Sequence, residues 1–199
     1  MGLAILILGL IVFLGSHVFV AQRDARAALI ARVGALPYKG LFSLVAFAGF
    51  VLICVGFAQY RATGWIDVWY PPRWTRHIAV AFMWPAFICI AAAYFPGGIK
   101  RTLKHPMLVS VKIWAAVHLI ANGDLGSIIL FGAFLAWAVY DRISLKRRSD
   151  AGAPPIPLGG RRNDMIAIAI GTILYFAFGL VVHPLFIGVP VMGTPAFGT

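Results

Sequence analysis

The sequence predicts an all-α protein, a polytopic bundle of about six transmembrane helices that forms a single membrane domain over residues 1–199. Hydrophobic residues make up 61% of the chain and charged residues only 12%, whereas a soluble domain has about 25% charged residues. The charges lie in short segments between long apolar runs. A chain with so little polar surface needs lipid around it, and in lipid each backbone polar group must be satisfied inside a helix.

The apolar runs give the predicted helices. A helix needs roughly 20 residues to cross the hydrocarbon core, and the runs at 2–20, 41–59 and 165–187 are long enough. The run at 78–95 contains Pro85, which a membrane helix tolerates with a kink. The predicted helices are residues 2–20, 41–59, 78–95, 105–121, 125–141 and 165–187, and residues 142–164 are predicted to be a cytoplasmic linker.

The stretch 105–141 is apolar but is interrupted by Asn122, Gly123 and Asp124. These residue types favour a tight turn. The interruption therefore predicts two short helices, 105–121 and 125–141. A re-entrant pair that enters and leaves on one side of the membrane is the alternative.

The distribution of Lys and Arg predicts the orientation. Thirteen of them lie in the segments 21–40, 96–106 and 141–164, whereas the other side of the membrane has only Arg61, Arg73 and Arg76. This bias places both termini outside the cytoplasm and predicts a multi-pass membrane protein. The positive charge then faces the headgroups of the lipid bilayer, and no nucleic acid is expected as a partner.

Ionisable side chains within a membrane are costly and are therefore candidates for function. All six acids are Asp, and none lies in the middle of a predicted helix, which argues against a carboxylate proton relay. The histidines and one lysine remain as candidates. They are His17, Lys112 and His118 within predicted helices, and His77, His105 and His183 nearer the helix ends.

Histidines on different helices at similar depth are what a bis-imidazole haem site requires. Helix rise places His17 and His105 in the cytoplasmic half, and His118 roughly 20 Å farther out than His105. His77 and His183 share that outer half. The alternative is that the histidines bond backbone carbonyls or lie in the wet interface.

The predicted helix 105–121 has two different polar faces. Trp114, His118 and Asn122 follow one another at four-residue intervals and share one stripe, whereas His105 and Lys112 share another. The side chain of Lys112 either extends to the cytoplasmic interface or has a buried partner. Two polar faces predict that this helix is central to the bundle.

Three blocks carry a family resemblance. They are Gly15-Ser16-His17, Arg101 with Lys104-His105-Pro106, and Trp114-x-x-x-His118-Leu119-Ile120-Ala121-Asn122-Gly123-Asp124. Together these blocks resemble the NnrU family of bacterial membrane proteins, which includes relatives of 15-cis-zeta-carotene isomerase.

The resemblance implies a multi-pass protein of the bacterial inner membrane that is associated with denitrification genes and, through the isomerase branch, haem b bound by histidines. It makes His17 and His118 the expected axial ligands, with His105 as a substitute for either, and Lys112 and Asn122 further expected cofactor contacts. His17 and His118 differ in predicted depth by roughly 13 Å, so a haem between them would have to tilt. In the isomerase the implied mechanism is reversible loss of one histidine ligand, after which the reduced iron engages a hydrophobic polyene.

Two other functions remain open. The Lys104-His105-Pro106 entry to a helix is similar to the cofactor-binding block of isoprenylcysteine carboxyl methyltransferases, but those enzymes use a Glu near the C-terminus and this chain has none. The third possibility is a noncatalytic subunit or assembly factor of a respiratory or photosynthetic complex, which would bind other membrane protein subunits.

Overall fold

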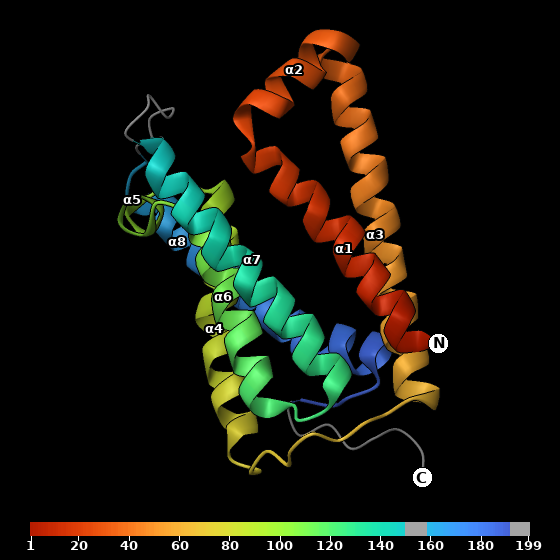
Figure 1. Ribbon diagram of the computed structural model, residues 1–199. Helices are drawn as coiled ribbons and strands as arrows, with labels where there is room; N and C mark the ends of the chain where they lie inside the picture. Colours follow the sequence, from red (N-terminus) through yellow and green to blue (C-terminus); the bar gives the residue numbers. More distant parts are fainter. Residues whose placement is uncertain (150–158, 192–199) are drawn as a thin grey trace. The chain divides into compact units, whose positions relative to one another are not determined.

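The computed structural model describes residues 1–149 and 159–191, which form helices joined by short connections (Figure 1). An isolated bridge between Asp67 and Asp124 is the extent of β-pairing in these residues. The helices are α1 (Gly2–Ala21), α2 (Arg23–Val33), α3 (Ala35–Thr63), α4 (Thr75–Tyr94), α5 (Gly98–Leu103), α6 (Pro106–Ala121), α7 (Leu125–Ser149) and α8 (Arg161–Ala177), and α8 continues into a π-helical segment, η1 (Phe178–Ile187).

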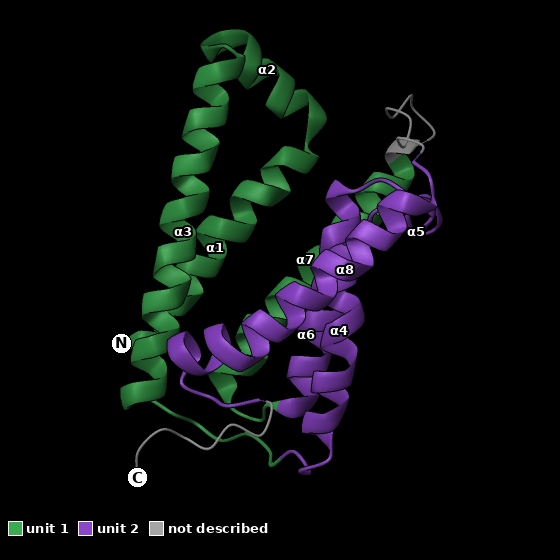
Figure 2. Cartoon of the chain, turned by 180° about the vertical axis from the view of Figure 1, so that it is seen from behind, with its two compact units in different colours: residues 1–70, 122–147 green, residues 71–121, 148–199 purple. Residues whose placement is uncertain are grey.

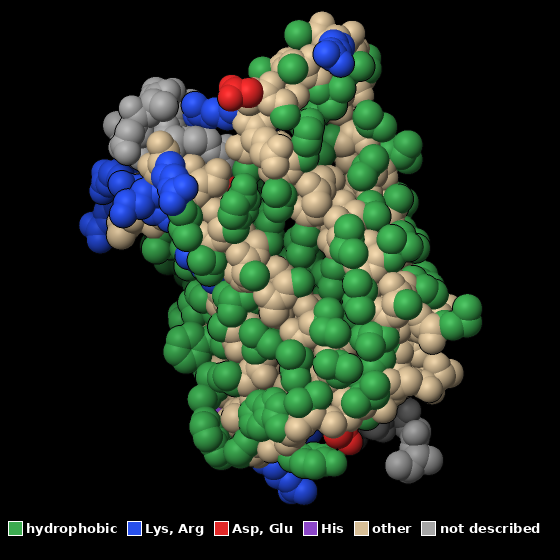
Figure 3. All heavy atoms as spheres, in the orientation of Figure 1, with side chains coloured by type: hydrophobic (Ala, Val, Ile, Leu, Met, Phe, Trp, Pro, Cys, Tyr) green, Lys and Arg blue, Asp and Glu red, His purple; other side chains and the backbone are tan. Residues whose placement is uncertain are grey.

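The predicted all-α membrane bundle is confirmed. Within residues 1–149 and 159–191, five helices are long and apolar enough to cross a membrane: α1, α3, α4, α7, and α8 together with η1. Helix α6 is apolar but has 16 residues, a length of about 24 Å. Large apolar side chains face outward along the helices, such as Leu44 and Phe47, which are 66% and 65% exposed. Figure 3 shows hydrophobic side chains along the helices and Lys and Arg near their ends, the surface of a multi-pass membrane protein.

The chain divides into two compact units (Figure 2). Unit 1 consists of Met1–Tyr70 and Asn122–Arg147, and unit 2 consists of Pro71–Ala121 and the described part of Arg148–Thr199.

Glycines set the packing of α1 against α3 in unit 1. A Cβ added at Gly9 would lie 2.6 Å from the backbone nitrogen of Ile53, and one added at Gly49 would lie 2.6 Å from the backbone nitrogen of Phe13. Gly2 and Gly56 approach the partner backbone in the same way. Small residues allow membrane helices to approach closely and gain dispersion contacts. The two helices run antiparallel along this seam (Figure 1).

The start of α7 is tied to the loop that follows α3, also in unit 1. The carbonyl of Gly123 accepts hydrogen bonds from the backbone nitrogens of Val68 at 2.9 Å and Trp69 at 3.1 Å. The Asp124 carboxylate, only 1% exposed, accepts a bond from the Ser127 nitrogen at 2.9 Å through Oδ1. This is the N-cap arrangement, and it explains why the predicted turn starts a helix.

In unit 2, α4 packs against both α6 and α8. A Cβ at Gly171 of α8 would lie 2.6 Å from the Cα of Ile88. The Trp84 indole donates to Thr172 Oγ1 at 3.0 Å, and the Tyr175 hydroxyl donates to the Val80 carbonyl at 3.0 Å. These pairs fix α8 antiparallel to α4.

The short helix α5 is held from two sides. The Asp164 carboxylate of α8 accepts hydrogen bonds from the backbone nitrogens of Gly98 and Ile99, each at 2.9 Å. Lys100 donates through Nζ to the Ala93 carbonyl near the end of α4 at 2.7 Å. Both contacts complement the helix ends, with an acid at an N-terminus and a cation at a C-terminus.

The helix ends differ from the predicted spans. Helix α3 begins at Ala35, whereas its predicted first residue was 41. Helix α7 runs to Ser149, whereas its predicted last residue was 141. Helix α8 begins at Arg161, four residues before the predicted residue 165. The predicted linker 142–164 is therefore helical at both ends, and its central part, 150–158, lies outside the described residues. Arg and Lys are good helix formers, so a helix does not end where its apolar run ends. For the same reason, α2 and α5 form in segments predicted to be plain connections.

Candidate functional site

His17 lies in the last turns of α1, and its ring is oriented by the backbone. Its Nδ1 is 2.7 Å from the carbonyl oxygen of Phe13, one helical turn earlier. A carbonyl oxygen can only accept, so Nδ1 carries the proton and the neutral ring has its lone pair on Nε2. Metal-binding histidines are commonly oriented in this way.

Aromatic rings from three helices of unit 1 surround this imidazole. The ring centroid of His17 lies 4.4 Å from that of Phe13, 5.3 Å from that of Phe42 on α3 and 5.5 Å from that of Trp137 on α7. Phe134, also on α7, contacts Phe13 at 5.7 Å. We refer to Phe13, His17, Phe42, Phe134 and Trp137 as the His17 cluster. It provides an apolar surface beside a nitrogen lone pair.

The His17 cluster also contains an unused donor. Trp137 Nε1 is buried and has no hydrogen-bond partner among the described residues. Buried donors are nearly always paired. The free N–H therefore suits a bound group with an acceptor atom.

His118 repeats the arrangement of His17 in unit 2. Its Nδ1 is 2.8 Å from the carbonyl oxygen of Trp114, again one turn earlier on the same helix, α6. The two rings have centroids 5.7 Å apart. The predicted stripe of Trp114 and His118 is therefore a real contact, and it leaves the lone pair of the His118 ring on Nε2.

His105 lies at the opposite end of α6 and directly follows a strained turn. Lys104 has φ 61° and ψ −48°, and the His105 nitrogen donates to the Leu103 carbonyl at 2.7 Å. This is a γ-turn, a rare and strained conformation. The carbonyl of His105 then accepts the first bonds of α6, from Leu108 and Val109.

Lys112 and Asn122 occupy different environments. Lys112 is partly buried in the middle of α6 and makes no hydrogen bond or ion pair with another described residue. Asn122 follows the end of α6 and belongs to unit 1. Extension of the Lys112 side chain to the interface and a buried partner both stay predictions.

Residues 5–191 match the family model described as NnrU protein. The chain belongs to the NnrU family. Neither a search of curated proteins nor a search of solved structures found a match.

A bare metal ion and a haem have different requirements for the oriented imidazoles of this NnrU protein. The described residues contain no group of three or more His, Cys, Asp or Glu side chains that could hold a bare metal ion. Haem iron needs less from the protein, because the porphyrin supplies four ligands and one or two side chains complete the coordination. A single oriented imidazole in an aromatic setting therefore fits haem.

The candidate residues are distributed over both units. His17 and Asn122 belong to unit 1, whereas His105, Lys112 and His118 are in unit 2 on or beside α6. The pairing of His17 with His118 or His105 stays a prediction.

Sequence reasoning missed the aromatic side chains of the His17 cluster. Two local signals were available, since Phe13 lies one turn before His17, and Phe134 and Trp137 share a face of α7. The contribution of Phe42 from α3 had no local signal, because it depends on how α3 packs in unit 1.

Proposed function

We propose that this NnrU-family protein binds haem b in the bacterial cytoplasmic membrane, with His17 as an axial ligand. The observation that carries the proposal is the 2.7 Å bond from His17 Nδ1 to the Phe13 carbonyl. It leaves the Nε2 lone pair for iron, while Phe42 and Trp137 line the ring with apolar surface. Aromatic walls also suit a flat, apolar macrocycle.

His118 is the second proposed ligand, because its ring is held in the same way by the Trp114 carbonyl. His105 is the substitute. The Lys112 ammonium group has no partner among the described residues and would suit a propionate of the haem. The side-chain amide of Asn122 offers hydrogen-bond donors. These proposed roles are the ones that the resemblance of the three sequence blocks to the family implies.

The chain's own groups would orient the cofactor and exclude water from it. Phe13 holds the ring of His17, and the apolar rings beside it lower the local polarity, which tunes a bound iron. Bound haem would supply an iron centre that can change its redox state and ligation. The proposed setting is denitrification or the isomerisation of a cis-carotenoid, with a hydrophobic polyene as the ligand.

The visible spectrum of the purified protein tests the haem proposal. We expect a Soret band in wild-type protein and a loss of most bound haem in His17→Ala and in His118→Ala. His183→Ala is the matched control, because His183 Nδ1 also bonds a backbone carbonyl, that of Val189 at 2.7 Å, and it is not a proposed ligand. The spectra also report whether one iron takes two imidazoles.

Several outcomes would reject the proposal. Unchanged pigment in both His17→Ala and His118→Ala would exclude these ligands. A colourless wild-type protein that co-purifies with defined membrane subunits would support the noncatalytic alternative, and methyl transfer from S-adenosylmethionine would support the methyltransferase alternative.

The proposed orientation has its own test. Thirteen Lys and Arg residues lie in the segments 21–40, 96–106 and 141–164, and this bias predicts that these segments are cytoplasmic. A reporter that is active only in the cytoplasm should be active when it is fused in the segment 21–40 and inactive when it is fused near residue 70. A reporter that is active only outside the cytoplasm should give the opposite result. The reverse pattern would overturn both the orientation and the predicted external termini.

A further inference from the structure

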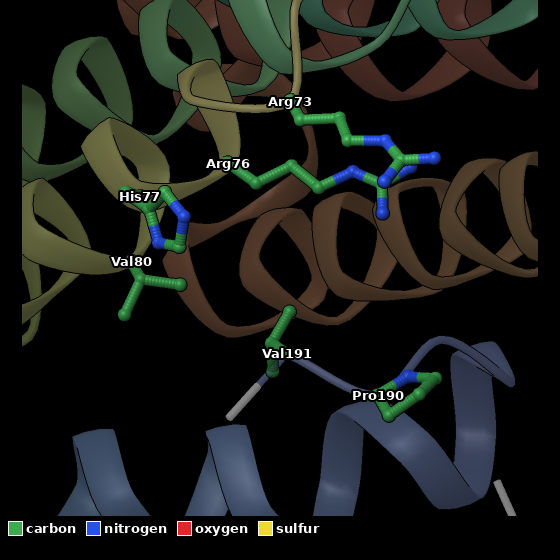
Figure 4. Close-up of a pocket in the computed structure, with 6 residues that line it drawn as sticks. All are labelled: Arg73, Arg76, His77, Val80, Pro190 and Val191. Carbon is green, nitrogen blue, oxygen red and sulfur yellow. The ribbon is translucent and has the colours of Figure 1, made fainter. Parts of the chain in front are cut away.

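A pocket of about 420 Å³ lies at the end of unit 2 where α4 begins and the chain leaves η1. Its lining combines three nitrogen-bearing side chains with three apolar ones (Figure 4). The lining residues are Arg73, Arg76, His77, Val80, Pro190 and Val191.

The two arginines place positive charge together without an acid. In Figure 4 the side chains of Arg73 and Arg76 extend in the same direction, and both line the same pocket. Neither guanidinium has a hydrogen bond or ion pair with a described residue, and no lining residue is acidic. Like charges at short range repel each other, so an anion between them would be stabilised.

The acidic side chain in the described part of unit 2 already accepts two hydrogen bonds elsewhere. Asp164 is the acidic residue in the described part of this unit, and its carboxylate accepts the bonds from Gly98 and Ile99 that hold α5. It lies at the beginning of α8, whereas the pocket lies beyond the end of η1. Within the described part of unit 2, the charge of Arg73 and Arg76 is therefore available to an anionic ligand.

The remaining lining side chains narrow the ligand chemistry. Guanidinium groups match the oxygens of phosphate, to which they can donate two parallel bonds. The His77 imidazole, beside Arg76 in the first turn of α4, adds a further nitrogen. Val80, Pro190 and Val191 give the pocket an apolar side, which would contact the carbon chain of an amphiphile.

We propose that this pocket binds a phosphate group through Arg73 and Arg76. A phospholipid headgroup and free inorganic phosphate share this chemistry, and the apolar side distinguishes them, because only the lipid would use it. The site shares no residue with the His17 cluster or with His118. The phosphate proposal can therefore be tested independently of the haem proposal.

The test measures ligand retention by the full-length protein in detergent. Three probes are added separately: phosphatidylglycerol, a diacylglycerol with the same acyl chains and no phosphate, and inorganic phosphate. Native mass spectrometry counts bound lipid, and isothermal calorimetry measures phosphate binding. The test variant is Arg73→Gln with Arg76→Gln, and its matched control is Arg161→Gln with Arg162→Gln, which removes two exposed arginines from the start of α8 in the same unit.

We expect the test variant to lose phosphate-dependent binding by about tenfold or more, since charge-assisted bonds are the strong ones. The control variant should keep it, and so should Arg73→Lys with Arg76→Lys in large part. Retention of phosphatidylglycerol but not diacylglycerol identifies a lipid headgroup, and binding of inorganic phosphate without lipid retention identifies free phosphate. Equal binding by wild type and the test variant, equal loss in test and control variants, or equal retention of diacylglycerol would overturn the proposal. The Soret band is recorded in parallel and should be unchanged in the test variant.

Discussion

The indole of Trp137 meets the imidazole of His17 edge to face, with ring centroids 5.5 Å apart and ring planes at 82°. This contact joins the last turns of α1 to the middle of α7 within unit 1. The two rings contribute an acceptor and a donor, respectively, to the His17 cluster: the imidazole a lone pair and the indole an N–H group. His17 has a lone pair on Nε2 that can accept or ligate, and Trp137 has a buried N–H without a described partner.

Trp137→Phe should leave the thermal stability of the protein unchanged or slightly higher. The phenyl ring keeps an aromatic contact with His17, while the unpaired donor, whose burial costs roughly 1–3 kcal/mol, is removed. Trp137→Ala should instead lower the free energy of unfolding by roughly 3 kcal/mol, because the ring is lost. The measurement is the melting temperature in detergent. A fall in Trp137→Phe as large as in Trp137→Ala would show that Nε1 has a partner in the folded protein.

Gly49→Ala should destabilise the pair α1 and α3 by roughly 1–3 kcal/mol. The new Cβ would meet the backbone nitrogen of Phe13 at 2.6 Å, and a backbone atom cannot move aside as a flexible side chain would. Gly40→Ala is the matched control on the same helix, since a Cβ there meets nothing within 4 Å. The control should gain up to about 1 kcal/mol from the better helix propensity of alanine. Equal melting temperatures for the two variants would contradict the glycine seam.

Much of the fold could be predicted from the sequence, because one large contribution to the free energy determines where membrane helices form. That contribution is the transfer of an apolar run into lipid. The helices α1, α3 and α4 were found from their runs, and the turn at Asn122-Gly123-Asp124 was found from its residue types. The predicted helix ends were wrong where a helix continues beyond its apolar run, because transfer into lipid does not determine those residues. The last turns of α7 lie beyond its apolar run and contain Lys and Arg, which are good helix formers. The first turn of α3 also lies outside its apolar run and contains Pro37, which is tolerated in the first turn of a helix.

The candidate site was less predictable, for a different physical reason. The ionisable members, His17 and His118, were found because charge or polarity inside a membrane is costly and rare. The apolar members could not be told apart from the chain's many other aromatic residues. Phe42 belongs to the His17 cluster through the packing of α3, and Arg73 and Arg76 line a pocket with Pro190, more than a hundred residues away in sequence. Only tertiary structure brings such residues together.

Lys112→Met should be well tolerated, in membrane yield and in melting temperature. The lysine is partly buried in α6 and has no described partner, so an isosteric apolar side chain loses no bond. Lys100→Met is the matched comparison, because Lys100 Nζ donates to the Ala93 carbonyl at 2.7 Å near the end of α4. That variant should lose about 1.5–3 kcal/mol, the usual net value of a hydrogen bond that involves a charged group. If Lys112→Met reduces yield more than Lys100→Met does, Lys112 has a partner in the membrane. A selective loss of haem in Lys112→Met would identify the cofactor as that partner.

Lys104→Gly should raise the stability of the protein, although it removes a cation and adds a glycine. Lys104 adopts φ 61° in the γ-turn before His105, a sparsely populated backbone conformation that costs a residue with a side chain roughly 1–3 kcal/mol. Glycine avoids that cost but has more freedom to lose on folding, so the net gain should be about 0.5–1 kcal/mol.

Lys104→Ala is the control for that variant, since it removes the same charge and keeps the strain. It should show no gain in melting temperature, and a gain equal to that of Lys104→Gly would mean that removal of the charge, and not relief of the backbone, is responsible. The haem content of the two variants separates stability from function. Strained backbone is retained where the surrounding structure requires it, and the turn fixes the direction in which His105 and Pro106 enter α6. If His105 contributes to cofactor binding, Lys104→Gly should be more stable than wild type and yet hold less haem, whereas Lys104→Ala should match wild type in both.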